Sequence, residues 1–193
     1  MGLRELLVGL ERRAARPLQR ISRGRLMKVY TMQEIRGLAE LLFEKVSQED
    51  FDLIVGIKRG GWPVAKYLAD RMGLKLDSIR ISTDSHSRFR ELFYLQGMET
   101  RKKPMILERP KERYEGKKIL LVDDECHSGG TLRLAKEYLK GKVKTAVLVW
   151  VRRPGLEPVI RPDYWAEIYT GRMKVFPWQD TSPHYIHPLE AEI

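Results

Sequence analysis

Apolar residues along the chain follow two patterns, short unbroken runs and repeats at helical spacing. The unbroken runs predict buried strands at 51–57, 74–81, 119–122 and 145–151, with weaker candidates at 164–169 and 173–176. Helical spacing predicts helices between them, one running from the Thr31–Glu34 capping box to Val46, one from 62 to 72 and one from 132 to 139. Because strands alternate with helices, the sequence predicts an α/β fold with a doubly wound parallel sheet.

Two segments break this alternation. Residues 3–21 carry apolar positions at helical spacing, with arginines between them and an interruption near Pro17. We therefore expect an amphipathic helical extension over 1–29, packed on the body or on a second subunit, with a membrane or an acidic partner as the alternative. The remaining chain, 30–193, is expected to be one domain. Within it the densely charged 82–116 is predicted to be a long flexible loop that closes over a site, and 92–95 could form a short hairpin there.

The segment from Ile119 to Thr131 carries the clearest chemistry. An apolar run is followed by Asp123 and Asp124, and then by a loop of small residues that opens a helix. Free backbone N–H groups at a helix N-terminus favour a phosphate. Adjacent carboxylates suit two neighbouring hydroxyls, because a carboxylate accepts hydrogen bonds and cannot donate them. Phosphate and diol together indicate a ribose 5-phosphate ligand, and the alternative is a strand that ends in an ordinary turn and helix cap.

This ordered motif resembles the phosphoribosyl-diphosphate (PRPP) signature of type I phosphoribosyltransferases. It is neither a Walker P-loop nor a dinucleotide fingerprint. The resemblance implies that Asp123 and Asp124 hold the ribose hydroxyls and, directly or indirectly, Mg²⁺. It also implies that the 5-phosphate is bound by the four loop residues Ser128, Gly129, Gly130 and Thr131.

A second candidate element follows the strand at 51–57. Lys58 and Arg59 could neutralise a diphosphate, and Gly60 and Gly61 would let backbone N–H groups approach it, whereas solvated cations on a glycine turn are the alternative. Purine-salvage phosphoribosyltransferases carry a similar loop about sixty residues before the signature. That resemblance implies that this loop binds the diphosphate of PRPP, that Arg59 stabilises it as it leaves, and that the Lys58–Arg59 bond is cis.

The C-terminal part is most similar to bacterial and archaeal xanthine, guanine and hypoxanthine enzymes. Segments 161–164 and 175–178 resemble the hood that covers the base in those proteins, so 161–193 is expected to be a hood and tail. The base half nevertheless departs from the family pattern. Family members carry a lysine that reads the 6-oxo group, and the matching cation here is Arg152 or Arg153. Arg is not a conservative replacement for Lys.

Two further departures concern the acceptor. His127 replaces the aspartate that is the supposed general base; a neutral imidazole could take that role, or no base is needed. Met173 replaces the tryptophan that stacks on the base, which gives a weaker platform that Trp165 or Trp178 could supplement. Arg152, Met173 and Lys174 are therefore the predicted base contacts, and His127 and Arg59 the predicted catalytic residues.

The resemblance implies a Mg²⁺-dependent pentosyltransferase that moves ribose 5-phosphate from PRPP to a nucleobase, expected to be a 6-oxopurine, and releases diphosphate. The altered base half and the basic N-terminus keep a rival hypothesis open, a catalytically inactive regulator of the same fold that binds PRPP or nucleotides. A receiver-like phosphoacceptor is disfavoured, because it would have acids at the first strand and no Gly-Gly-Thr loop.

Composition and charge add little to the choice between these functional hypotheses. The 193 residues include 36 Lys and Arg against 26 Asp and Glu, a formal charge of +10 that suits polyanionic ligands. The cations are scattered along the chain, so nucleic acid is not an expected partner. No apolar run approaches membrane-spanning length, and the single cysteine, Cys126, excludes an internal disulfide and predicts a cytoplasmic location. By resemblance the protein is expected to be a homodimer.

Overall fold

The computed structural model describes residues 27–82, 104–153, 155, 157–171, 173–180 and 182–193. The helix expected at 3–21 and the hairpin considered at 92–95 lie outside these residues. Among the helices of the described segments, none is long and apolar enough to cross a membrane.

Six strands form the main sheet in the order β4-β3-β2-β5-β6-β7. They are β2 (Leu53–Lys58), β3 (Lys75–Ser82), β4 (Met105–Glu108), β5 (Lys118–Cys126), β6 (Lys142–Val151) and β7 (Tyr164–Tyr169). All neighbours are parallel except β4, which pairs antiparallel with β3 at one edge. The predicted doubly wound α/β sheet is confirmed, with one antiparallel edge strand that the sequence did not predict.

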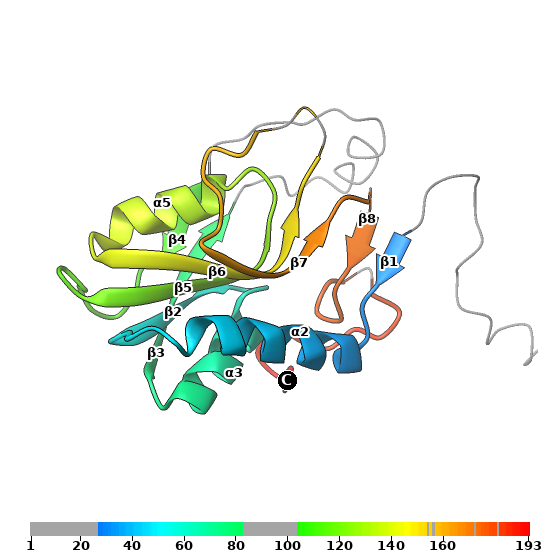
Figure 1. The fold of residues 1–193 in the computed structure, drawn as a ribbon, viewed down its shortest axis with the longest axis horizontal. Helices are drawn as coiled ribbons and strands as arrows, with labels where there is room; N and C mark the ends of the chain where they lie inside the picture. The colour runs from blue at the N-terminus through cyan, green and yellow to red at the C-terminus, as the bar shows by residue number, and fades with distance from the viewer. Residues whose placement is uncertain (1–26, 83–103, 154, 156, 172, 181) are drawn as a thin grey trace, which may run out of the picture.

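Helices cover both faces of this sheet. Figure 1 shows α5 (Gly130–Leu139) on one face and α2 (Met32–Val46) with α3 (Trp62–Met72) on the other. Ile54, Leu120 and Leu148 belong to the core under α2 and α3. Leu53, Leu121 and Val147 belong to the core under α5. Successive residues of a strand point to opposite faces, and both faces are buried here, which is why the central strands read as unbroken apolar runs.

The helix ends follow their sequence signals. The backbone N–H of Glu34 donates to the Thr31 hydroxyl at 3.2 Å, and the Thr31 N–H donates to the Glu34 carboxylate at 2.8 Å, which confirms the capping box of α2. Helix α3 ends at Gly73, whose φ of 64° lies in the left-handed region that favours glycine.

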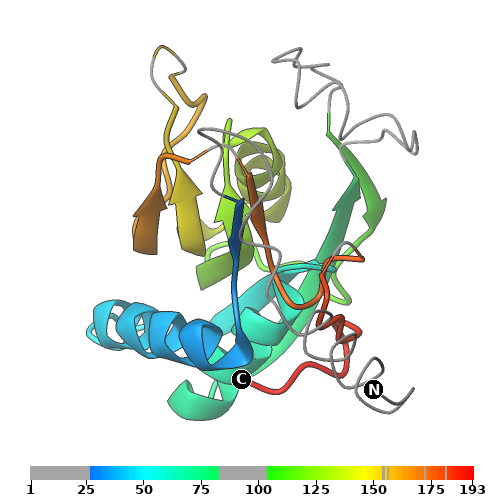
Figure 2. The same cartoon turned by 90° about the vertical axis from the view of Figure 1, so that its right-hand side faces the viewer.

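A small parallel ribbon stands beside the edge strand β7 (Figures 1 and 2). It consists of β1 (Met27–Val29) and β8 (Met173–Val175), and we call it the β1–β8 ribbon. Lys28 Nζ contacts both carboxylate oxygens of Glu167 on β7, at 2.8 and 2.9 Å. Three rings that follow the ribbon strands in sequence stack on one another, with centroid distances of 5.1 Å from Tyr30 to Phe176 and 5.4 Å from Phe176 to Trp178. The ion pair ties the ribbon to the sheet, and so do two hydrogen bonds from the ends of the stack, from the Tyr30 hydroxyl to Glu167 and from the Trp178 indole N–H to Asp124.

Candidate active site

The sheet order predicts a ligand site between β2 and β5. The chain turns from β2 towards β3 on one side and from β5 towards β6 on the other, so these two neighbours form the topological switch point. In open α/β sheets ligands bind at the carboxyl ends of strands at such a point. The loop after β2 and the acids of β5 lie at these ends, so the fold brings the two predicted PRPP-binding elements together.

The two glycines of the β2–α3 loop lie directly against the acid pair. A Cβ atom on Gly60 would lie 2.2 Å from Asp124 Oδ2, and one on Gly61 would lie 2.6 Å from the Cα of Asp123. Real Cβ atoms do not come that close, so only glycine allows this approach. The Lys58–Arg59 peptide bond is cis, as the resemblance implied. The Arg59 side chain is exposed, and Lys58 Nζ lies 3.8 Å from Glu108 Oε2 on β4.

Both acids are nearly buried, Asp123 at 9% and Asp124 at 8% exposed. They lie within β5, which continues to Cys126 rather than ending at Val122 as predicted. The Asp124 N–H donates to Asp123 Oδ1 at 3.0 Å, and the Trp178 indole Nε1–H donates to Asp124 Oδ2 at 2.9 Å. Burial, and then the neighbouring Asp124, raise the pKa of Asp123 well above its usual range. This pair therefore favours a ligand that brings hydroxyl donors or positive charge.

The carboxylates of Asp123 and Asp124 are possible ligands for Mg²⁺. Two adjacent carboxylates suit a magnesium ion that keeps several waters and is shared with substrate phosphates. The described residues contain no group of three or more side chains of the kinds that ligate metals, so a cage made by the protein alone is not what they offer. The acid pair thus fits Mg²⁺ that arrives with a phosphorylated ligand.

The predicted phosphate loop connects β5 to α5. Gly129 has a φ of 76°, and a Cβ on it would lie 2.3 Å from the carbonyl oxygen of Ile160. The Val159 N–H donates to the Ser128 carbonyl at 2.8 Å, so the 159–160 segment supports this loop from outside. Helix α5 begins at Gly130, with Thr131 in its first turn. The free N–H groups of a helix start favour an anion, and the binding of a phosphate here stays a prediction.

Glu125 is a residue of this site that the sequence analysis missed. Its Oε2 lies 3.3 Å from His127 Nε2 and also forms an ion pair with Lys174 Nζ of β8. The Lys174 side chain is only 5% exposed. Burial lowers the pKa of its ammonium to about 8, while the Asp124 carboxylate opposes that fall. The sequence signal for Glu125 was a charged residue at the end of a buried strand. That signal did not reveal its partner Lys174, which comes from a distant segment.

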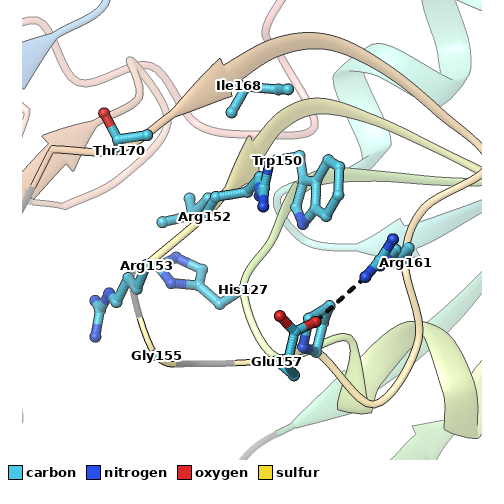
Figure 3. A pocket seen from close by; sticks show the side chains of 11 residues that line it. His127, Trp150, Arg152, Arg153, Gly155, Glu157, Arg161, Ile168 and Thr170 are labelled. Carbon is cyan, nitrogen blue, oxygen red and sulfur yellow. Dashed lines mark hydrogen bonds and ion pairs between the residues drawn. The ribbon is translucent and has the colours of Figure 1, made fainter.

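A pocket of about 250 Å³ opens beside the loop (Figure 3). It lies at the ends of β6 and β7, and its lining includes His127, Trp150, Arg152, Arg153, Glu157 and Arg161. The guanidinium of Arg152 lies 5.3 Å from the centroid of the Trp150 ring, and Arg161 pairs with Glu157 at 3.3 Å. His127 and the predicted base contact Arg152 therefore share one pocket.

The other two predicted base contacts do not line this pocket. Lys174 is turned to Glu125, and the side chain of Met173 lies outside the described part of the chain. Trp165, considered as a supplementary platform, packs edge-on against Trp150 with a centroid distance of 4.9 Å. Trp178 is tied to Asp124.

Comparison with known proteins agrees with this geometry. A family model described as "Phosphoribosyl transferase domain" matches residues 28–181. The orotate phosphoribosyltransferase of Sulfurisphaera tokodaii is 35% identical over 117 residues, 59% of this chain and 51% of that protein, so the match spans about half the length of that relative. The xanthine-guanine phosphoribosyltransferase of Gluconobacter oxydans is 29% identical over 158 residues, 81% of this chain and 84% of the relative.

Among solved structures, the purine phosphoribosyltransferase from Pyrococcus horikoshii Ot3 superposes with a TM-score of 0.63 at 25% identity. That match covers 79% of this chain and 93% of the other. The names of the three relatives share the transferred group; two of them name purines as the acceptor and one names orotate.

Proposed function

Because the chain belongs to the phosphoribosyltransferase family, and within it is like the bacterial xanthine-guanine enzymes, we propose that it transfers ribose 5-phosphate from PRPP to a ring nitrogen of a 6-oxopurine. The contact of Gly60 and Gly61 with Asp123 and Asp124 supports this proposal, because it brings the loop predicted to bind diphosphate next to the acids predicted to bind the ribose hydroxyls. Diphosphate is the leaving group.

The PRPP half assigns a task to each element. Asp123 and Asp124 accept hydrogen bonds from the two ribose hydroxyls. The backbone N–H groups of the Ser128–Thr131 loop at the start of α5 hold the 5-phosphate. Arg59, Gly60 and Gly61 hold the diphosphate, and the exposed Arg59 stabilises the charge that develops on it as the bond to C1 breaks.

Mg²⁺ belongs to this proposal as a companion of PRPP. When bound, it would neutralise charge on the phosphate oxygens. The Asp123 and Asp124 carboxylates are the residues that would hold it, directly or through water, and each would have to be ionised to do so.

The acceptor half uses the pocket beside the loop. His127 lines it and takes the proton that the ring nitrogen releases, while Arg152 donates hydrogen bonds to a carbonyl oxygen of the base. In the proposed reaction the lone pair of the ring nitrogen forms the new bond to C1. The electron pair of the old C1–O bond leaves with diphosphate.

We place this reaction in a cytoplasmic homodimer of the domain at 30–193, with 161–193 as hood and tail and 1–29 as an extension. The single buried cysteine fits a reducing compartment. Light scattering on the purified chain measures the dimer.

Calorimetric titration with PRPP and Mg²⁺ tests the binding half. Gly60→Ala pushes a methyl group into Asp124, and Asp123→Asn removes a carboxylate, so each variant should weaken PRPP binding at least about tenfold. The matched control is Gly37→Ala on the exposed face of α2, where nothing lies within 4 Å of the added carbon. It should bind PRPP like the unaltered chain and gain about 0.5–1 kcal/mol of stability. Unchanged PRPP affinity in both site variants would contradict the assignment.

A further inference from the structure

Three charged side chains lie in one row across the sheet, next to the loop that we propose binds diphosphate. Lys58 ends β2, Arg80 lies near the end of β3, and Glu108 ends β4. The strand register pairs Lys58 with Arg80, and Arg80 with Glu108. Paired residues of neighbouring strands project from the same face of a sheet, so these side chains come together. We call them the Lys58–Arg80–Glu108 row.

The Glu108 carboxylate contacts both cations of the row. The Arg80 guanidinium donates from Nη1 to Glu108 Oε1 at 2.8 Å, and Lys58 Nζ lies 3.8 Å from Glu108 Oε2. The hydrogen bond from Arg80, together with the charge of Lys58, holds the pKa of Glu108 below its usual range. The carboxylate is therefore ionised, and the row carries a net charge of +1 from its three members.

These ion pairs are too exposed to matter mainly for stability. The side chains of Lys58, Arg80 and Glu108 are 28%, 43% and 49% exposed, and ion pairs between side chains of this kind add little to the stability of a fold. The register nevertheless holds two like charges side by side, and these repel each other unless negative charge lies close by. The row therefore suits a ligand that brings more negative charge than Glu108 supplies.

The surroundings of Lys58 extend this positive region to the predicted diphosphate loop. Lys58 Nζ lies 5.5 Å from the centroid of the Trp62 ring, and Trp62 opens helix α3. The first turn of α3 carries no acidic residue, so the partial positive charge of the helix N-terminus is not neutralised there. The exposed Arg59 follows Lys58 in the chain. Positive groups thus run from Arg80 to the start of α3.

We propose that Arg80 is a further diphosphate-binding residue, which acts together with Lys58, and that Glu108 is an internal counter-charge which diphosphate displaces from both cations. This inference rests on the proposed function, because it places the diphosphate of PRPP at the β2–α3 loop. When diphosphate binds, its oxygens replace the Glu108 carboxylate on Arg80 and Lys58. A guanidinium suits this exchange, because its fork can donate two hydrogen bonds to phosphate oxygens.

Calorimetric titration of the full-length protein with inorganic diphosphate and Mg²⁺ tests this inference without turnover. Arg80→Gln removes a cation and should weaken diphosphate binding at least about fivefold. Glu108→Gln removes the competing carboxylate and should tighten diphosphate binding about two- to fivefold. A merely structural role of Glu108 predicts the opposite sign, because loss of its ion pairs would then leave both cations less well placed.

Lys75 and Glu112 provide matched control variants. They form an exposed ion pair at 2.6 Å, and Lys75 lies at the opposite end of β3 from Arg80. Lys75→Gln and Glu112→Gln change the net charge as Arg80→Gln and Glu108→Gln do, and they should leave the diphosphate affinity unchanged. Ribose 5-phosphate is the control ligand, because we place its phosphate at the start of α5. Its affinity should be the same in the unaltered chain and in both test variants.

An unchanged diphosphate affinity in Arg80→Gln overturns the inference, and so does an unchanged or weaker affinity in Glu108→Gln. Loss of PRPP binding in Gly60→Ala would then still support the proposed function. If both test variants behave as expected but the unaltered chain transfers ribose 5-phosphate to no base, the proposed function fails while the diphosphate subsite stands. If neither the unaltered chain nor Glu108→Gln binds diphosphate, both proposals fail.

Discussion

At the scale of single residues, the acids of β5 show a conflict between stability and binding. Asp123 and Asp124 are nearly buried side by side, and the ammonium of Lys174, which interacts electrostatically with Asp124, is itself paired with Glu125. Burial and the neighbouring carboxylate make the ionised form of Asp123 unfavourable until a ligand arrives. Such an arrangement is typical of a binding site whose residues favour the bound ligand at a cost to the stability of the unliganded protein.

Replacing Asp123 by Asn should therefore stabilise the unliganded protein. The pKa of Asp123 is raised in the folded state, so folding binds a proton and becomes less favourable as pH rises from the unfolded value of about 4 through the folded one. The variant lacks this loss. The free energy of unfolding of Asp123→Asn should equal that of the unaltered chain near pH 4 and exceed it by at least about 1 kcal/mol at high pH.

Urea unfolding at several pH values measures this difference, with Asp50→Asn as the control at an exposed carboxylate. A gap between Asp123→Asn and the unaltered chain that shrinks as pH rises would show that Asp123 is not the destabilising group.

Cys126 permits a second test at this scale. It lies on β5, is 3% exposed, and burial raises the pKa of its thiol to about 12. Because the thiolate is the reactive form, alkylation at pH 8 should be at least about a thousandfold slower in the folded protein than in denaturant. The chain has no other cysteine, so mass spectrometry reads the reaction directly. Rapid labelling of the native protein would show that this strand end is open.

At the scale of elements, the β1–β8 ribbon is linked to the acid pair. The Tyr30–Phe176–Trp178 stack ends in the indole N–H that donates to Asp124 at 2.9 Å. At its other end, the Tyr30 hydroxyl donates to Glu167 at 3.1 Å. The stack thus connects Asp124 of the PRPP half with the segment 161–193, which we propose covers the acceptor.

Trp178→Phe should separate the hydrogen bond to Asp124 from the aromatic packing of the stack. A smaller aromatic ring remains in the stack, but Asp124 loses a buried donor, which costs about 1–3 kcal/mol, and PRPP affinity should fall. Tyr30→Phe is the control, because it keeps an aromatic ring in the stack and removes one hydrogen bond, at the end away from the acids. Calorimetry with PRPP should find it close to the unaltered chain, and equal PRPP affinity in the two variants would contradict the link.

At the scale of the whole molecule, much of the fold follows from local signals. Unbroken apolar runs predict the central strands because helices bury both sheet faces, and β7 has the predicted bounds of 164–169. The capping box of α2 and the glycine after α3 mark their helices. The two loops of the PRPP half could be predicted because each follows a strand at the same edge of the sheet.

Other features depend on contacts between distant segments and have no local signal. Strand β4 lies in the predicted loop 82–116; it is short, sits at the sheet edge, and leaves Met105 and Leu107 about half exposed, so no buried run marks it. Strand β1 falls at the end of the segment predicted as an extension and is defined by its pairing with β8. Glu125 and Lys174 likewise become a pair only in the folded chain.

The most direct measurement of the central claim is diphosphate release from PRPP and Mg²⁺ by the purified chain, with hypoxanthine, guanine, xanthine, adenine, orotate and uracil as acceptors. We predict release that depends on a 6-oxopurine and is lost in Asp123→Asn. Tight PRPP binding without release on any of these bases would contradict the enzyme assignment and favour a PRPP-binding regulator. Release with orotate or adenine alone would contradict the proposed acceptor.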